Sequence, residues 1–413
     1  MKVLVIGGGP AGMMAAGTAA QGGAQVTLLE RNEKVGRKLA ITGKGRCNVT
    51  NNCPLLNDLI ANVPVNGRFL YGAFARFAPN DTIDFFEDLG VPLKIERGNR
   101  VFPVSDNAYD IVDAMLRFLK KTGVRREQGR AVSLLTENGA VCGCVTDDGR
   151  TIPADAVILA TGGLSYPGTG STGDGYAMAK AVGHTVTDLK PSLVPLECHE
   201  GWCSEAQGLS LRNVALTVED SKTGREIYRD FGEMLFTHFG VSGPMVLSAS
   251  SHIRDMERGR YVLHIDFKPA LTYEQLDKRL QRDLLECSNK NLFNTLSLLL
   301  PRKMIPIVVK LSGVNGMLTS NQVTREMRGA LVDLLKDIRL TVTDFRPIDE
   351  AVVTSGGIDV GEVNAKTMES RLVSGLYFAG EILDVDAYTG GFNLQIAFAT
   401  GRLAGASACG GKE

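Results

Sequence analysis

The sequence of 413 residues predicts an α/β fold built around a parallel sheet, into which a second region is inserted. Two short apolar runs, at 2–6 and 25–29, flank a helix-forming stretch at 10–21, and this strand–helix–strand order implies parallel strands. A fully apolar strand follows at 156–160, and strands resume near Leu340 after a region of different character. The first domain is therefore expected to use both ends of the chain.

The composition is that of a folded protein without a membrane or nucleic-acid partner. Apolar residues make up 44% and charged residues 22% of a chain that exceeds the ~250–300 residues one core usually supports. The net charge of −1 leaves no basic footprint for nucleic acid. No window reaches the ~18 apolar residues of a membrane helix, and the eight cysteines show no metal-site spacing. We expect a cytoplasmic protein without a metal that acts on a small molecule; the composition does not indicate its oligomeric state.

Local signals place further elements in the first domain. A glycine follows each of two helical stretches, and an N-capping side chain precedes each. Asn-Gly and Asp-Gly pairs, at 138–139 and 148–149, predict an antiparallel meander. The expected elements are helices at 80–89 with Asn80 as N-cap, at 105–122 with Ser105 as N-cap and from about Phe392 to Leu403, and a last strand at 375–379.

The middle of the chain is expected to form two inserted parts. Strand runs at 214–218 and 261–267 accompany one helix that begins near Ser242, whereas 272–337 carries helical apolar spacing. The expected boundaries are 1–190 with 346–413 for the first domain, 191–271 with 338–345 for a β-rich domain, and 272–337 for a small helical domain, whose helices are expected at 273–285, 293–300 and 323–335.

A glycine motif follows the first strand. Gly7-Gly8-Gly9-Pro10-Ala11-Gly12 has the spacing G-x-G-x-x-G and opens the first helix. Glycines there permit a tight turn and let backbone N–H groups approach a pyrophosphate, whose charge the helix N-terminus favours. Glu30, at the end of the second strand, is placed to accept the ribose hydroxyls of an adenosine. The motif predicts a Rossmann-like dinucleotide site; the alternative is a glycine turn that only packs a helix on a strand.

Two later segments favour FAD over NAD as the dinucleotide. Thr161-Gly162-Gly163 forms a strand-to-glycine turn that can pass close to a cofactor, and a late strand ends in Gly380-Glu381 before a helix that opens after Gly390-Gly391. In two-dinucleotide-type flavoproteins such an acid meets the ribityl chain, and such a helix N-terminus faces the flavin pyrimidine edge. FAD is therefore expected as the cofactor. NAD(P)H is expected as a transient electron donor, because the inserted region lacks a second glycine motif.

A basic segment, Gly36 to Asn48, carries four cations and three glycines in 13 residues. Its cations can reach the diphosphate and ring of a flavin. The alternative is a solvated basic loop.

Four segments resemble a known family: GRKLAITGKGRCN, ATGGLSYPGTGSTGDGY, FTHFGVSGP and GEILDVDAYTGGFNLQIAFATG. They are similar to those of the BaiN-like bacterial flavoproteins, a group of NAD(P)/FAD-dependent oxidoreductases also described as aminoacetone-oxidase-like. The resemblance covers essentially the whole chain. It implies a Rossmann-like FAD domain, an inserted β-rich domain and a small helical domain.

The resemblance also implies tight FAD binding and a reaction. Its name-giving member reduces C=C bonds of 3-oxo bile-acid intermediates, which implies a steroid or bile-acid substrate. The residues that would hold FAD by this resemblance are Gly7, Gly9, Pro10, Ala11, Gly12, Glu30, Arg31, Lys38, Gly43, Arg46, Asn48, Gly380, Glu381, Asn393 and Leu394, with Val132 touching the adenine.

Reduction of an enone needs a group that polarises the carbonyl and one that supplies a proton. Tyr166 and Tyr388 lie beside glycine turns and are candidates, each with a packed loop tyrosine as the alternative. His238 is a third candidate, although a structural histidine that caps a turn before a helix explains it better. Cys47 and Cys53 lack the close spacing of a flavin disulfide reductase pair.

Two other functions stay open. A flavin oxidase of small amines such as aminoacetone would reoxidise its flavin with dioxygen. An RNA-associated flavoprotein would hold RNA with the inserted region, and the near-neutral charge speaks against it.

Overall fold

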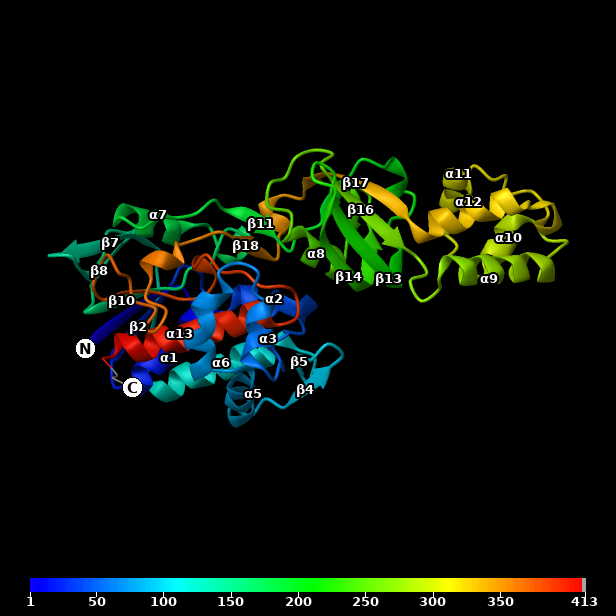
Figure 1. Ribbon diagram of the computed structural model, residues 1–413. Coiled ribbons are helices and arrows are strands. Elements are labelled where there is room, and N and C mark those ends of the chain that lie inside the picture. The colour runs from blue at the N-terminus through cyan, green and yellow to red at the C-terminus, as the bar shows by residue number, and fades with distance from the viewer. Residues whose placement is uncertain (411–413) are drawn as a thin grey trace. The chain divides into compact units, whose positions relative to one another are not determined.

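The computed structural model describes residues 1–410, which divide into two compact units (Figure 1). The first unit contains residues 1–192 and the chain from residue 348 onward, and the second contains residues 193–347.

The first unit is built on a five-stranded sheet in which every pairing is parallel. The predicted α/β fold is therefore confirmed. Val5 pairs with Leu28 on one side and with Ile158 on the other, and all three side chains are buried because helices cover the sheet. In sheet order the strands are β19 (Leu376–Phe378), β10 (Ala156–Leu159), β1 (Lys2–Ile6), β2 (Gln25–Glu30) and β6 (Arg125–Gln128).

Two helices rich in small residues lie side by side against this sheet, α1 (Pro10–Gln21) and α13 (Phe392–Ala408) (Figure 1). A Cβ on Gly401 would lie 2.4 Å from the carbonyl oxygen of Ala11, so glycine is what lets the two backbones approach. The final helix runs to Ala408 instead of ending at Leu403, because its last turns stay buried against α1.

The N-caps of two other helices differ from the prediction. α5 (Pro79–Asp88) is capped by Ala78, not Asn80, because Pro79 has the fixed φ of a first helical residue. α6 (Ala108–Thr122) is capped by Asn107, whose side chain accepts the N–H of Tyr109 at 3.1 Å. Ser105 bonds to the Asp110 side chain instead.

The remaining elements of the first unit are short. The predicted meander is present, with left-handed backbone at both Asn138 (φ 52°) and Gly139 (φ 78°) in its first turn. The meander strands are β7 (Ala131–Glu137), β8 (Ala140–Thr146) and β9 (Thr151–Pro153); the other elements are α2 (Arg37–Gly45), β3 (Thr50–Asn51), α3 (Leu56–Ala61), α4 (Tyr71–Arg76), β4 (Leu93–Glu96), β5 (Arg100–Pro103), α7 (Asp174–Ala181), β11 (Lys190–Ser192) and β18 (Val353–Ser355).

The second unit is a closed antiparallel barrel with a helical extension. Alternate residues of its long strands are buried, as Leu216 and Val218 are, which is the period expected of a strand with one face in a core. In barrel order the strands are β12 (Leu196–Cys198), β15 (Gly240–Ser242), β14 (Arg225–Phe236), β13 (Ser210–Asp220), β16 (Tyr261–Asp266) and β17 (Ile338–Phe345), and α8 (Pro244–Ser250) packs on β14.

Four helices between β16 and β17 form a group beyond one end of the barrel strands (Figure 1). The sequence predicts three of them and misses the third in chain order, α11. They are α9 (Tyr273–Glu286), α10 (Leu292–Leu296), α11 (Met304–Ser312) and α12 (Arg325–Lys336).

Candidate functional site

The glycine loop between β1 and α1 has no room for side chains on its inner face. A Cβ on Gly12 would lie 1.8 Å from the carbonyl oxygen of Gly7, and a Cβ on Gly7 (φ 107°) would lie 2.4 Å from that of Ala160. Gly9 differs, because a Cβ there would meet no described atom within 4 Å. Gly9 is also the N-cap of α1, followed by Pro10 at the first helical position. The loop is therefore closed inward and open over the helix N-terminus, where an anionic diphosphate would bind.

Glu30 lies at the carboxyl end of β2 and is bonded to this loop. Its Oε2 accepts the N–H of Gly8 at 2.6 Å, and its Oε1 accepts the N–H of Asn32 at 2.8 Å. The Asn32 side chain donates to Glu30 and to the carbonyl of Thr169, at 3.0 Å. The half-buried carboxylate keeps further lone pairs, so it fits the hydroxyls of a ribose.

Glu381 is the centre of a polar cluster at the ends of β10 and β19. Its Oε2 lies 2.7 Å from Nζ of Lys38, and its Oε1 accepts the Ser165 hydroxyl and the N–H of Thr354, each at 2.9 Å. Lys38 also donates to Ser165 Oγ at 2.7 Å. This cluster ties α2 to the glycine turn after β10, so the acid predicted to meet a ribityl chain is fixed by its neighbours.

α2 links the glycine loop to the start of α13. The N–H of Gly36 donates to the carbonyl of Gly8 at 2.8 Å, before the helix begins. Beyond its end, Oδ1 of Asn48 lies 3.0 Å from the position of a Cβ on Gly391, the N-cap of α13. That oxygen is buried and has no hydrogen-bond partner among the described residues. An orphaned acceptor beside a helix N-terminus is a group that a ligand with N–H or O–H donors would satisfy.

Three amide side chains fix the start of α13. Gln395 is fully buried; its Oε1 accepts the hydroxyls of Thr50 and Thr82, each at 2.7 Å, and its Nε2 donates to the carbonyl of Phe77 at 2.8 Å. Asn51 donates to the carbonyl of Gly390 at 3.0 Å. Asn393 donates to the carbonyl of Ala387 at 2.8 Å, so its side chain holds the preceding loop.

The carboxyl edge of the parallel sheet thus brings most of the predicted cofactor residues together, in the place where Rossmann-like folds bind dinucleotides. These are Gly7, Gly9, Pro10, Ala11 and Gly12 of the loop, Glu30, Lys38, Gly43 and Asn48, Thr161 and Gly162 after β10, Gly380 and Glu381 after β19, and Asn393 and Leu394 on α13.

Two of the predicted cofactor residues have other contacts, and a third is exposed. Arg46 pairs with Glu96 and Asp106 and stacks 4.2 Å over the Phe102 ring, which directs its guanidinium to this cluster. Arg31 lies 3.1 Å from a carboxylate oxygen of Asp174 on α7. Val132, on β7 of the meander, is 46% exposed.

The two candidate tyrosines lie in different loops of the first unit. Tyr166 is exposed and has left-handed backbone (φ 53°), and its carbonyl accepts the N–H of Thr169 at 2.8 Å. Its loop is bonded to Glu381 through Ser165 and to Asn32 through Thr169. Tyr388 is half-buried in the loop that Asn393 holds at the start of α13.

His238 belongs to the second unit. It is exposed in the turn between β14 and β15, with its ring 5.0 Å from that of Phe239. The helix that follows, α8, begins only at Pro244, so His238 does not cap it.

The eight cysteines are all free thiols. Cys47 is fully buried, and burial raises the pKa of its thiol to about 12. A thiol with so high a pKa is a poor nucleophile.

Sequence reasoning missed Gln395, Asn51, Ser165 and Thr354, which connect the elements of this site. The only signal for Gln395 is a polar residue on an otherwise apolar helix face. No signal in the chain indicates that Ser165 and Thr354 meet.

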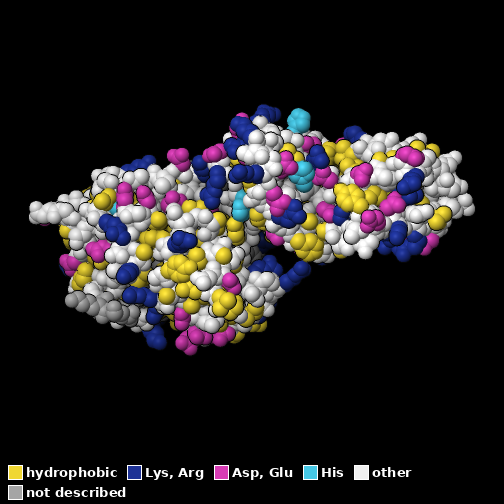
Figure 2. Space-filling model, in the orientation of Figure 1, with side chains coloured by type: hydrophobic (Ala, Val, Ile, Leu, Met, Phe, Trp, Pro, Cys, Tyr) yellow, Lys and Arg dark blue, Asp and Glu magenta, His cyan; other side chains and the backbone are white. Residues whose placement is uncertain are grey.

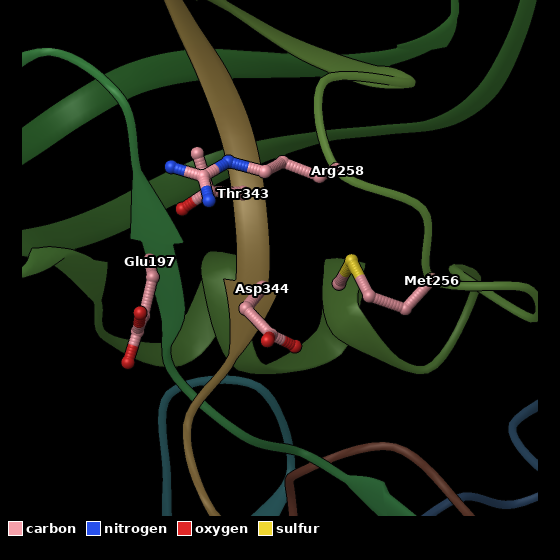
Figure 3. A pocket seen from close by; sticks show the side chains of 5 residues that line it. All are labelled: Glu197, Met256, Arg258, Thr343 and Asp344. Atoms are coloured by element: carbon pink, nitrogen blue, oxygen red, sulfur yellow. The ribbon is translucent and has the colours of Figure 1, made fainter.

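The second unit carries a surface hollow of about 280 Å³ (Figure 3). Glu197 and Asp344 are paired residues of β12 and β17, and both line it. The other lining residues are Met256, Arg258 and Thr343, so it contains none of the residues predicted to bind a cofactor or to act in catalysis.

No described helix has the length and apolar character needed to cross a membrane. Within residues 1–410, no three His, Cys, Asp or Glu side chains form a cluster that could hold a metal ion.

The fold and the edge-of-sheet site define a protein of the Rossmann-type FAD-binding class. The 3-ketosteroid delta1-dehydrogenase of Sterolibacterium denitrificans shares this fold, with a TM-score of 0.54, 14% identity and 99% of each chain covered. The chain belongs to the family described as HI0933-like protein Rossmann domain, which matches residues 1–407.

Relatives of known name match nearly the whole chain. The 3-dehydro-bile acid delta(4,6)-reductase of Clostridium scindens is 35% identical, with 98% of each chain covered. The ribosomal RNA dihydrouridine synthase of Escherichia coli is 33% identical and covers 96% of this chain and 95% of its own. The family resemblance predicted from the four motifs is confirmed.

Proposed function

We propose that the protein is an FAD-dependent oxidoreductase that reduces a C=C bond conjugated to a carbonyl group, with NAD(P)H as its electron source. One observation carries the proposal: near-full-length relatives of two different names, the bile-acid reductase and the ribosomal RNA dihydrouridine synthase, are both named for this kind of chemistry. A delta(4,6)-reductase of a 3-dehydro bile acid saturates bonds conjugated to the 3-oxo group. A dihydrouridine synthase saturates the uracil bond conjugated to a ring carbonyl.

The residues of the first unit fit FAD. The loop from Gly7 to Gly12 would hold the diphosphate and Glu30 the adenosine ribose, while the start of α13 and the orphaned Oδ1 of Asn48 suit the polar edge of a flavin. When bound, FAD supplies the hydride for the reduction. The protein supplies orientation, a positive helix N-terminus for negative charge, and a proton.

Tyr388 is the better placed of the two tyrosines to supply that proton. Tyr388 lies in the loop that leads into α13, which would face the flavin. The loop of Tyr166 is also hydrogen-bonded, through Thr169 and Asn32, to Glu30, the residue that would hold the adenosine ribose. A tyrosine phenol is protonated at pH 7 and can therefore donate its proton. His238 is a weaker candidate because it is exposed in a barrel turn.

For the substrate, we propose a 3-oxo steroid such as a bile-acid intermediate, after the more similar of the two relatives. The near-neutral charge of the chain supports a small molecule over RNA, since RNA affinity rests on basic surface. On the face shown in Figure 2, Lys and Arg are interspersed with Asp and Glu. The relationship to a ribosomal RNA enzyme nevertheless makes a uridine in ribosomal RNA the second candidate.

The test is anaerobic absorbance spectroscopy of the purified FAD protein. We expect NADH or NADPH to bleach the flavin, and a 3-oxo-4,6-diene bile acid to restore its colour. Recovery with uridine-containing ribosomal RNA, and not with the bile acid, would select the second candidate. Failure of both nucleotides to bleach the flavin would remove the proposed electron source.

The oxidase alternative is tested in the same apparatus. If the protein is an amine oxidase, aminoacetone will bleach its flavin without NADH or NADPH, and hydrogen peroxide will form rapidly in air. That result would replace the reductase proposal.

A further inference from the structure

Of the four cations in the basic segment, three have partners in the protein. Arg37 donates to Oδ1 of Asn32 at 2.8 Å, Lys38 is paired with Glu381, and Arg46 with Glu96 and Asp106. The Lys44 side chain is exposed and makes no hydrogen bond or ion pair to any other residue within 1–410. It is the one cation of the segment whose side chain has no polar partner among the described residues.

The backbone at Lys44 is left-handed, with φ 59° and ψ 41°, between Gly43 (φ 57°) and Gly45 (φ 82°). The two glycines take this conformation without penalty, but a lysine does not. No hydrogen bond or ion pair of the Lys44 side chain within the described protein compensates for that strain. Strained residues of this kind gather at ligand sites, because there the side chain has a use that glycine lacks.

Lys44 lies near the end of α2, four residues before Asn48, which lies beside the start of α13. The Cβ position of the neighbouring Gly43 is 3.0 Å from the backbone nitrogen of Asn48, whose orphaned Oδ1 faces Gly391. The opposite end of α2 is bonded to the diphosphate loop through Gly36 and Gly8. Lys44 therefore belongs to the end of the candidate site that is remote, along α2, from the diphosphate loop.

We propose that Lys44 is a catalytic residue whose ammonium group binds the carbonyl oxygen of the substrate; this rests on the proposed reduction of an enone. When a hydride from reduced FAD is added to the β-carbon, the electron pair of the C=C bond moves toward the carbonyl and leaves negative charge on its oxygen. The ammonium of Lys44 stabilises that oxygen, and the α-carbon then takes a proton from a neighbouring acid.

The test uses the full-length FAD protein with Lys44→Met, Lys44→Arg and Lys44→Gly, and Lys120→Met as a matched control at an exposed lysine of α6. We expect Lys44→Met to slow flavin reoxidation by the enone by about 100-fold or more, in the 10²–10³ range of lost oxyanion donors. Lys44→Arg should recover part of the rate, and Lys120→Met should leave it unchanged.

Two readouts do not depend on turnover. Lys44→Gly should raise the Tm by about 2 °C while losing as much rate as Lys44→Met, because glycine relieves the strain and removes the cation. The flavin midpoint potential should be the same in all variants. A rate within twofold of wild type in Lys44→Met overturns the assignment, as does a shift in potential that accounts for the lost rate.

Failure of this inference and failure of the proposed function look different. If no enone reoxidises the wild-type flavin, the proposed function fails before any variant is compared. If the wild type is active and Lys44→Met matches it, only the role of Lys44 is wrong.

Discussion

Nζ of Lys38 lies 2.7 Å from Oε2 of Glu381, which joins α2 to the turn after β19 across 343 positions of sequence. Both side chains are only 20% exposed, so the pair is partly shielded from water. Lys38→Met would leave the carboxylate half-buried without its cation. We expect a loss of about 1–2 kcal/mol in the free energy of unfolding, between the values for surface and buried pairs.

Lys38→Met should also weaken FAD binding, because Glu381 and Ser165 lose the group that holds them in place. Urea unfolding and a fluorescence titration of the apoprotein with FAD measure the two effects. Lys120→Met, at an exposed site, is the control. If Lys38→Met matches the wild type in both stability and FAD affinity, the Lys38–Glu381 pair stabilises neither the fold nor the cofactor site.

Two glycines of the same loop should respond differently to alanine. In Gly12→Ala the new Cβ would lie 1.8 Å from the carbonyl oxygen of Gly7, so we expect the loop to distort and the protein to lose several kcal/mol of stability or fail to fold. In Gly9→Ala the Cβ meets no described atom within 4 Å and φ is −77°, so the fold should be kept. The new methyl group would occupy the space of the diphosphate.

The comparison is made on purified protein, by thermal unfolding and by the FAD retained per chain. We expect Gly9→Ala to unfold within about 2 °C of the wild-type apoprotein, as a neutral surface change does, and to retain little FAD. Full FAD occupancy in Gly9→Ala would contradict the placement of the diphosphate over this glycine.

Short-range signals in the sequence correctly predict several elements of the candidate cofactor site. The first helix is placed correctly at Pro10–Gln21, because a glycine loop followed by a proline marks the first helical position. α11 is missed because Pro306 interrupts an apolar run, which argues against a helix; yet Pro306 lies in the first turn, where its missing N–H is not needed. The kinked α2 gives no apolar period that would reveal it.

Contacts between residues that are far apart in the sequence cannot be predicted from such short-range signals. Glu381 is visible as an acid after a strand, but its contacts with Lys38, Ser165 and Thr354 depend on how four distant segments pack. Arg46 is the opposite case, because its partners in the fold are ones that the sequence does not indicate. Its place in a basic segment suggests a flavin contact, whereas Glu96, Asp106 and the Phe102 ring surround it in the fold.

Gln395 is the buried residue whose replacement should most disturb the start of α13. Gln395→Leu keeps the approximate volume but leaves the hydroxyls of Thr50 and Thr82 and the carbonyl of Phe77 without this partner. We expect a loss of about 2–4 kcal/mol, since each unsatisfied buried group costs about 1–3 kcal/mol. Urea unfolding measures it. Gln395→Glu should be milder at low pH, where a protonated carboxyl still donates; equal stability of Gln395→Leu and wild type would show that the network is not needed.

His184 bridges Glu362 and Ser370 in an arrangement that resembles a hydrolytic triad. Nδ1 lies 3.0 Å from Oε2 of Glu362, and Nε2 lies 2.8 Å from Oγ of Ser370. However, Ser370 Oγ already accepts the N–H groups of Leu372 and Val373, at 3.0 and 2.8 Å. Because both lone pairs of its hydroxyl are engaged and the residue is buried, Ser370 is not placed to act as a nucleophile. The three residues stabilise the fold instead.

This histidine should make stability depend on pH. Burial lowers the pKa of the His184 imidazole below its ordinary 6.5, and the carboxylate of Glu362 offsets only part of the effect. Below pH 6.5 the unfolded chain therefore binds more protons than the folded protein, and the free energy of unfolding falls as the pH falls toward the folded-state pKa. Above pH 6.5 the contribution of this group is fully present. Urea unfolding between pH 5 and 8 should show a shallower decline for His184→Gln than for wild type, while the half-buried His252, whose pKa burial also lowers, contributes to both. Parallel declines in the two proteins would mean that His184 does not titrate in this range.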